Sequence, residues 1–159
     1  MNRRLLGIYL NDHLAGAVGG VELARRALHN NRGTELEPDL ERLLAEIEED
    51  RAVLESLMDR LGVARNPVKA RGAWLLEKVG RLKLNGSTLG YSPLSRVEEL
   101  EALAVGVEAK RSMWIALKRV RDQGADLGVD VEDLITRAQR QRRVLERRRL
   151  EAVAGTFEG

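Results

Sequence analysis

The sequence predicts an all-α fold, a bundle of four long helices, from three observations. Aromatic residues make up only 3% of the chain, while Ala, Leu, Glu and Arg dominate it, and strands favour aromatic and β-branched side chains. Four long segments carry apolar residues at steps of three and four, the spacing of one helix face. A long stretch without such a stripe separates the second segment from the third. The length of 159 residues suits a single domain, residues 1–159.

The first predicted helix covers residues 2–30. Its apolar stripe consists of Leu10, Leu14, Ala17, Val21, Ala24 and Leu28. Gly16, Gly19 and Gly20 lie inside this segment, and each costs about 0.5–1 kcal/mol of helix stability relative to Ala. We therefore expect these glycines either to allow a close helix crossing or to soften the helix. Turn-type residues at 30–33 end the segment.

The second predicted helix covers residues 37–61. Thr34 is a candidate N-cap, because Glu37 follows it three residues later as in a capping box. Gly62 is a natural C-terminal cap. Only Asp50 interrupts the apolar stripe, which otherwise consists of Leu36, Leu40, Leu43, Ile47, Leu54, Leu57 and Leu61.

Residues 63–92 form a connection that is far longer than a usual helix–helix loop. Within it, residues 73–84 can make a short amphipathic helix with Trp74 on its apolar side. A connection of this length can pass from one end of a bundle to the other. We therefore expect the second and third long helices to run parallel.

The third and fourth predicted helices cover residues 93–123 and 130–153. Ser92 is a candidate N-cap of the third helix, with Pro93 at its first helical position. Asp130 is the candidate cap of the fourth helix, and Asp133 complements the positive end of its dipole. We expect the tail, residues 155–159, to be frayed.

Each apolar stripe carries polar residues on or beside it near its middle. They are His13, Asp50, Glu108 with Arg111, and Gln141 with Arg142. Interruptions at similar heights in four helices predict a buried polar layer. A lone buried carboxylate costs several kcal/mol, so we expect Arg111 or Arg142 to neutralise the two carboxylates of this layer. The alternative is that these residues lie at the stripe edges and reach solvent.

The charges are distributed unevenly, although the net charge is only +2. Ten acidic residues lie between residues 35 and 62, and seven arginines lie between residues 137 and 149. Two such segments can pair inside one molecule. A basic helix can also bind nucleic acid or an anionic membrane surface, but no recognition motif accompanies this one. We therefore favour the internal pairing.

Several other kinds of chemistry lack their motifs in this chain. There is no cysteine, which excludes disulfides and thiolate metal sites and favours a reducing cytoplasm. There is no phosphate-binding loop, nucleophile elbow or zinc-protease motif. No stretch approaches the length of a transmembrane helix, and we interpret the apolar run at residues 5–10 as a helix start rather than an export signal. We expect a cytoplasmic protein.

The order and length of the helical segments, with the long central connection, resemble ferritin-like four-helix bundles over essentially the whole chain. The outline is most similar to small bacterial members that place a short helix in the crossover. Di-metal members of this superfamily use one carboxylate from each of two helices and a Glu-x-x-His pair from each of the other two. The resemblance places Glu108 at the expected position on the third helix, and Asp12 or His13 at the comparable height on the first.

This sequence departs from the ligand pattern of that superfamily on the second and fourth helices. On the second helix Glu46 is followed three residues later by Glu49, and Asp50 falls near the place of the histidine. On the fourth helix Gln141 and Arg142 occupy the site region, and the chain contains no Glu-x-x-His pair. The departure predicts that ion pairs replace the metal site.

We therefore predict a non-enzymatic scaffold or interaction protein without a cofactor, with a homodimer as the first expectation for its assembly. The alternative is a carboxylate-ligated iron or manganese protein, an oxidase or a metal store, with irregular ligands. The candidate ligands are Asp12, His13, Glu46, Glu49, Asp50 and Glu108. A second alternative is a basic-helix protein that binds nucleic acid or an anionic membrane.

Overall fold

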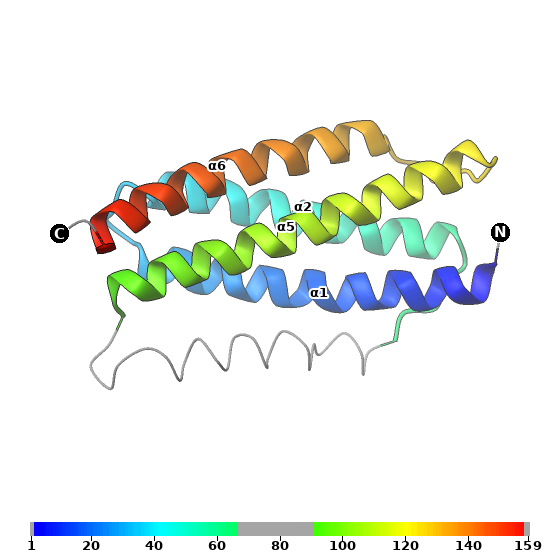
Figure 1. Cartoon of the computed structure of the whole chain (residues 1–159). Coiled ribbons are helices and arrows are strands. Elements are labelled where there is room, and N and C mark those ends of the chain that lie inside the picture. Colours follow the sequence, from blue (N-terminus) through cyan, green and yellow to red (C-terminus); the bar gives the residue numbers. More distant parts are fainter. Residues whose placement is uncertain (1, 67–90, 158–159) are drawn as a thin grey trace.

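The computed structural model describes residues 2–66 and 91–157, and these ranges are all-α. Four helices pack side by side within them (Figure 1). They are α1 (Arg3–Asn30), α2 (Glu37–Arg60), α5 (Pro93–Asp122) and α6 (Val131–Phe157). The predicted all-α bundle of four long helices is confirmed. The short helix expected at residues 73–84 lies outside the described residues.

Short turns join α1 to α2 and α5 to α6, so each of these pairs is antiparallel (Figure 1). The helices α2 and α5 run in the same direction, as the long connection between them predicts. Helix α5 packs against α6 and α1, and α1 packs against α2. The backbones of α2 and α6 approach each other much less. The helices therefore follow the order α1, α2, α6, α5 around the bundle, with α2 and α5 at opposite corners.

The apolar stripes supply two core clusters along the bundle. One cluster is built around residues such as Val21, Leu40, Leu100 and Leu145. The other includes Leu10, Leu54, Leu117, Leu134 and the fully buried Trp114. Asp50 and Gln141 are buried at stripe positions where the two clusters meet. The middle of the bundle is therefore the level at which polar side chains interrupt the hydrocarbon core.

Two of the predicted N-caps are present. The hydroxyl of Ser92 accepts a hydrogen bond of 3.2 Å from the Ser95 amide, and the hydroxyl of Ser95 accepts one from the Ser92 amide. Pro93 occupies the first turn of α5. The carboxylate of Asp130 accepts a bond of 3.1 Å from the Asp133 amide at the start of α6. Each cap satisfies an amide that has no partner within its helix.

The C-terminal end of α2 agrees with the prediction, and the N-terminal end does not. Thr34 and Glu37 do not cap α2, because its N-cap position is Leu36, which makes no side-chain cap. Instead the Thr34 hydroxyl accepts from the Leu36 amide, and the Glu37 carboxylate accepts from the amide of Gly33 in the preceding turn. At the other end, Gly62 ends the helix with a φ of 66°, a conformation that favours glycine.

Helix α6 extends further than we expected. Residues 155–157 are helical, where we expected fraying to begin. The hydroxyl of Thr156 donates a hydrogen bond of 2.6 Å to the carbonyl oxygen of Ala152. The residue Ala152 itself packs against the core. This contact holds the last described turn to the helix. None of the helices in the described ranges is long and apolar enough to span a membrane.

Candidate functional site

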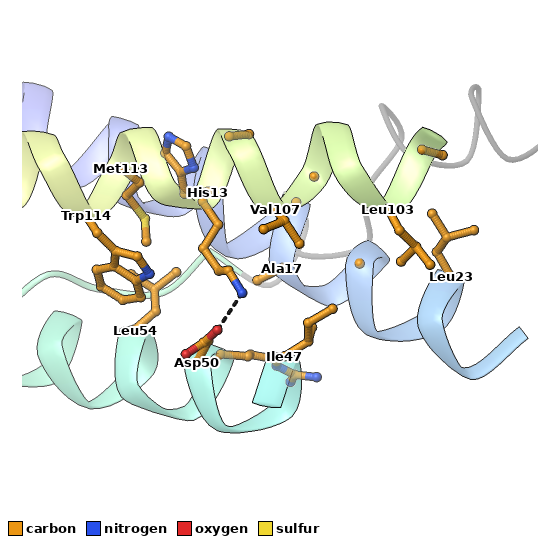
Figure 2. A pocket seen from close by; sticks show the side chains of 17 residues that line it. His13, Ala17, Leu23, Ile47, Asp50, Leu54, Leu103, Val107, Met113 and Trp114 are labelled. Carbon is orange, nitrogen blue, oxygen red and sulfur yellow. Dashed lines mark hydrogen bonds and ion pairs between the residues drawn. The ribbon is translucent and has the colours of Figure 1, made fainter. Parts of the chain in front are cut away.

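A buried carboxylate and a buried amide face each other in the middle of the bundle. Asp50 of α2 is 2% exposed and Gln141 of α6 is 3% exposed. Lys110 of α5 extends between them, and its ammonium group donates one hydrogen bond to the Asp50 carboxylate and another of 2.6 Å to Gln141 Oε1. The dashed line at Asp50 in Figure 2 marks the ion pair. Three helices therefore meet through polar side chains at this level.

A second cation lies against the same carboxylate. Arg137 Nη1 is 3.2 Å from Asp50 Oδ1 and 3.0 Å from Glu49 Oε2. The two oxygens of Asp50 thus face different cations, Lys110 on one and Arg137 on the other. Paired in this way, a carboxylate can be buried without the full cost of an isolated charge.

Glu46 of α2 also bonds to this group of side chains. Its carboxylate accepts a bond of 2.8 Å from Gln141 Nε2 and another of 2.8 Å from Arg140 Nη2. Gln141 is therefore an acceptor toward Lys110 and a donor toward Glu46. We call Asp50, Lys110, Gln141, Arg137 and Glu46 the mid-bundle cluster.

The environment shifts the pKa values of two members of the mid-bundle cluster. Burial lowers the pKa of the Lys110 ammonium below its ordinary value, and the nearby charge of Asp50 opposes this effect only in part. For Glu46, burial by itself would raise the pKa. The hydrogen bonds from Gln141 and Arg140 outweigh burial, so the pKa of Glu46 lies below its ordinary value.

The other members of the expected polar layer lie elsewhere. We expected Arg111 or Arg142 to neutralise both carboxylates of the layer. Both arginines bind Glu108, each at 2.9 Å, where α5 faces α6. For Asp50 the prediction was wrong, because its cations are Lys110 and Arg137. The Glu108 side chain is 36% exposed. The bond from Arg111 is the main reason that the pKa of Glu108 is lowered. These three residues form a surface ion-pair group that is separate from the mid-bundle cluster.

Lys110 was missed although the sequence carries a signal for it. We followed a stripe on the third helix that included Arg111. A second series of residues on the same helix, with steps of four, three, four and three, consists of Leu103, Val107, Lys110, Trp114 and Leu117. The apolar residues of this second series are all buried. Because neighbouring helix residues differ by about 100° in direction, residue 110 faces the core and residue 111 does not.

His13 lies beside the mid-bundle cluster and is half-buried on α1. Its ring packs edge-to-face on Tyr9, with 4.5 Å between the ring centroids. Burial lowers the pKa of His13, and the charge of the exposed Asp12 opposes this shift in part. His13 therefore contributes to the wall of a cavity and not to the ion pairs at Asp50.

The residues that we named as candidate metal ligands do not converge on one point. Glu49 is largely exposed and binds Arg137, and Glu108 lies in its separate group with Arg111. Among residues 2–66 and 91–157, no group of three or more His, Cys, Asp or Glu side chains is placed to hold a metal ion. The buried carboxylate of Asp50 is hydrogen-bonded to Lys110, a cation of the chain itself.

A cavity of about 80 Å³ lies next to the mid-bundle cluster, between α1, α2 and α5 (Figure 2). Asp50 and Lys110 form part of its wall, and most of the remaining wall is apolar. Gly16, Gly20 and Gly106 also line it, and a Cβ atom at any of the three would meet nothing within 4 Å. The close helix crossing, one of our two expectations for the glycines of the first helix, is therefore not seen at Gly16 or Gly20.

A second buried carboxylate lies nearer to one end of the bundle and was not predicted. Glu99 of α5 is 4% exposed. It accepts hydrogen bonds from Arg26 at 2.9 Å, Asn30 at 3.1 Å and Tyr91 at 3.0 Å. Burial is the main reason that the pKa of Tyr91 is raised to about 12. These contacts connect α1 to the start of α5, so we assign Glu99 a structural role.

The arginines of α6 pair with acidic side chains of the same molecule. Toward α2, Arg137 binds Glu49, Arg140 binds Glu46 and Arg148 binds Asp39, with separations of 2.7 to 3.0 Å. The internal pairing that we favoured from the charge pattern is therefore present between α2 and α6.

Comparisons of this chain with known protein families, with curated proteins and with solved structures found no match. The class that the described residues define is an all-α bundle of four helices with a buried ion-pair cluster at its middle.

Proposed function

We propose that this chain is a non-enzymatic bundle of ferritin-like architecture that acts as a scaffold or interaction protein, with ion pairs in place of a metal site. One observation carries the proposal: Lys110 donates to both Asp50 and Gln141 in the middle of the bundle, where the resemblance to ferritin-like proteins led us to look for metal ligands. A cation of the chain competes with a metal ion for the same carboxylate. The buried polar groups of the cluster are bonded to one another.

The donor set does not fit a di-metal centre. A pair of metal ions requires several carboxylates and imidazoles that point toward one place. Here His13 packs on Tyr9, and Glu46 is held by Arg140 and Gln141. We therefore place no chemical step at this level of the bundle.

Metal analysis of the full-length protein tests this proposal against the metal-protein alternative. The protein is purified without chelator, and its iron, manganese and zinc contents are measured. We expect each metal well below one ion per chain. We also expect added Mn²⁺ to leave the free energy of unfolding unchanged, whereas a native-state ligand at a hundred times its dissociation constant adds about 2.7 kcal/mol. A stoichiometric metal that Asp50→Asn removes would overturn the proposal.

We further propose that the chain works as a homodimer. Long helical bundles often self-associate with two-fold symmetry, and Val105 of α5 and Leu150 of α6 are each 52% exposed. Sedimentation equilibrium of the full-length protein in the micromolar range tests this part. A dimer mass is expected, and a monomer mass over the whole range would refute it.

A further inference from the structure

Large apolar side chains are exposed on both α5 and α6. On α5, Val105 is 52% exposed and Leu94 is 39% exposed. On α6, Leu150 is 52% exposed and Phe157 is 64% exposed. A surface helix normally presents polar side chains on the side away from its core. Apolar side chains that are exposed together mark interaction surfaces, so we asked whether these four share one face.

On α5 the exposed apolar side chains flank the glutamates that face α6. Glu101 and Glu108 pair with arginines of α6 at 3.4 and 2.9 Å. Leu94 precedes Glu101 by seven residues, or two turns, and Val105 follows it by four. Both therefore lie on the same side of α5 as Glu101. This side faces solvent in the described part of the bundle, because the Glu101 side chain is 53% exposed.

On α6 the exposed apolar side chains lie beside an arginine of these pairs. Arg149 is the partner of Glu101. Leu150 directly follows Arg149 and lies about 100° further around the helix, away from the buried Leu145. Phe157 follows Leu150 by seven residues and extends the same row. The outer face of α5 and α6 therefore carries apolar side chains from both helices. We call Leu94, Val105, Leu150 and Phe157 the α5–α6 patch.

The two helices of this face carry opposite charge. The α5 segment 97–109 contains four glutamates and no lysine or arginine, and Glu101 and Glu108 among them lie on the outer side. The α6 segment 137–149 contains seven arginines and one glutamate. Among these, Arg143 is exposed and makes no ion pair with the residues described, since it bonds to the Gln139 carbonyl of its own helix. An acidic strip therefore lies beside a basic one.

This charge pattern distinguishes the two ways in which two-fold symmetry can place the face against a second copy. A symmetry axis that runs across the helices would set α6 against the partner's α6, so that arginines meet arginines. An axis that runs along the helices sets α5 of each copy against α6 of the partner, so that acidic side chains meet basic ones. Like charges in contact oppose association, and opposite charges favour it.

The area of the face is sufficient for a stable dimer. Helix α5 has 30 residues and α6 has 27. Each is therefore about 40 Å long, and a face two helices wide is roughly 20 Å across. The face measures about 800 Å², which is the area that each partner buries in a stable interface of standard size.

We propose that two copies of this chain associate through the α5–α6 patch, with α5 of each copy packed antiparallel against α6 of the partner. This inference rests on the proposed homodimer and names its surface. The pairs Glu101–Arg149 and Glu108–Arg142 show which residues of α5 and α6 lie at the same level. By this register Val105 of one copy lies near Glu146 of the partner subunit.

Sedimentation equilibrium of full-length variants tests the surface. Val105→Asp and Leu150→Asp should each raise the dissociation constant of the dimer at least about tenfold, because each places a charge in an apolar contact. Leu5→Asp is the matched control, since Leu5 is 60% exposed on α1 and lies outside the patch. The control should stay within about twofold of the wild type. Circular dichroism checks that each variant is folded.

Disulfide crosslinking tests the arrangement, because the chain has no cysteine of its own. Val105→Cys is mixed with ¹⁵N-labelled Glu146→Cys and oxidised, and mass spectrometry identifies the mixed disulfide dimer. We expect this product in much higher yield than in a mixture of Val105→Cys with ¹⁵N-labelled Glu41→Cys. Glu41 is the matched control, because it is an exposed glutamate on α2, which lies diagonally opposite α5 in the bundle.

The outcomes separate this inference from the homodimer itself. A wild type that is monomeric over the whole concentration range would refute both. A wild-type dimer whose dissociation constant is unchanged by Val105→Asp and by Leu150→Asp would leave the homodimer in place and overturn this surface. Equal yields of mixed disulfide with Glu146→Cys and with Glu41→Cys would overturn the packing of α5 against the partner's α6.

Discussion

The Lys110 ammonium group connects three helices, because it lies on α5 and donates to side chains of α2 and α6. An ammonium group has three protons to donate, so it can satisfy both acceptors at once. A buried pair of this kind adds little net stability compared with well-packed apolar residues. Removing one partner is costly, because the other charge is then left buried.

Replacing Lys110 by Met should therefore lower the free energy of unfolding by about 3 kcal/mol, since Arg137 would be the one cation left beside Asp50 among the described residues. Urea denaturation measures the loss. The combined substitution of Asp50→Leu with Lys110→Met should recover most of it, because no buried charge then lacks its partner.

Lys118→Met is the matched control, since Lys118 pairs with Glu132 on the surface of the bundle and is 40% exposed. Its cost should stay below about 1 kcal/mol. Equal losses for the two lysine substitutions would show that the buried pair has no special role.

His13 should make stability depend on pH. Burial lowers its pKa below the ordinary value of 6.5, so the native state favours the neutral imidazole. As the pH falls below that value, the unfolded chain takes up a proton before the native state does, and the free energy of unfolding decreases. Thermal unfolding between pH 7.5 and 5.5, both about one unit from 6.5, should show this decrease in the wild type.

His13→Gln should remove most of this pH dependence, whereas His29→Gln, at an exposed helix end, should retain it. The carboxylates with lowered pKa, Glu46 and Glu108, affect stability only below their ordinary value of 4.5 and so lie outside this window. A pH dependence that persists unchanged in His13→Gln would assign it to other groups.

For single helices, the sequence predicted an N-cap correctly where the cap depends on residues close together in the chain. The Ser92 and Asp130 caps were predicted correctly, because each bonds an amide three positions further along. The Thr34–Glu37 pair was wrong as a cap of α2. In the structure both side chains bond within the preceding turn, and the N-cap position is taken by Leu36, whose side chain is buried in the core.

Ser92→Ala should cost about 1 kcal/mol, because α5 then loses the hydrogen bond at its N-terminus. The measurement is urea denaturation of the full-length protein. Ser112→Ala is the control, since Ser112 is exposed in the interior of the same helix, and its effect should stay within about 0.5 kcal/mol. A loss as small as that of the control would mean that the cap contributes nothing.

At the scale of the whole molecule, acidic α2 and basic α6 neutralise each other across the widest backbone separation among neighbouring helices. Long arginine and carboxylate side chains suit that separation, because they can bridge it. Four arginines of α6 take part in this pairing, namely Arg137, Arg140, Arg147 and Arg148. The charge complementarity therefore explains how a chain with a strongly basic helix has a net charge of only +2.

A variant with Asp39→Asn, Glu46→Gln and Glu49→Gln should release the arginines of α6. We expect it to retard mixed DNA in a gel shift at low salt and to lose this binding as salt is raised, while the wild type leaves DNA mobility unchanged. Wild-type binding of similar strength would favour the nucleic-acid alternative.

The control variant carries Glu22→Gln, Glu41→Gln and Glu98→Gln. It has the same change in net charge, but these side chains make no ion pair with α6 among the residues described. If both variants bound DNA equally, net charge alone would account for the effect.

Sequence patterns alone were enough to predict the four long helices, the caps of α5 and α6, the parallel course of α2 and α5, and the positions of Asp50 and Gln141 on otherwise apolar faces. These properties depend on periodicity and on residues close together in the chain. The pairing of Lys110 and Arg137 with Asp50, and the burial of Glu99, became visible in the packed bundle. An apolar stripe defines a helix face to within about 100°, whereas a side chain's partner depends on how distant helices are rotated and packed against one another.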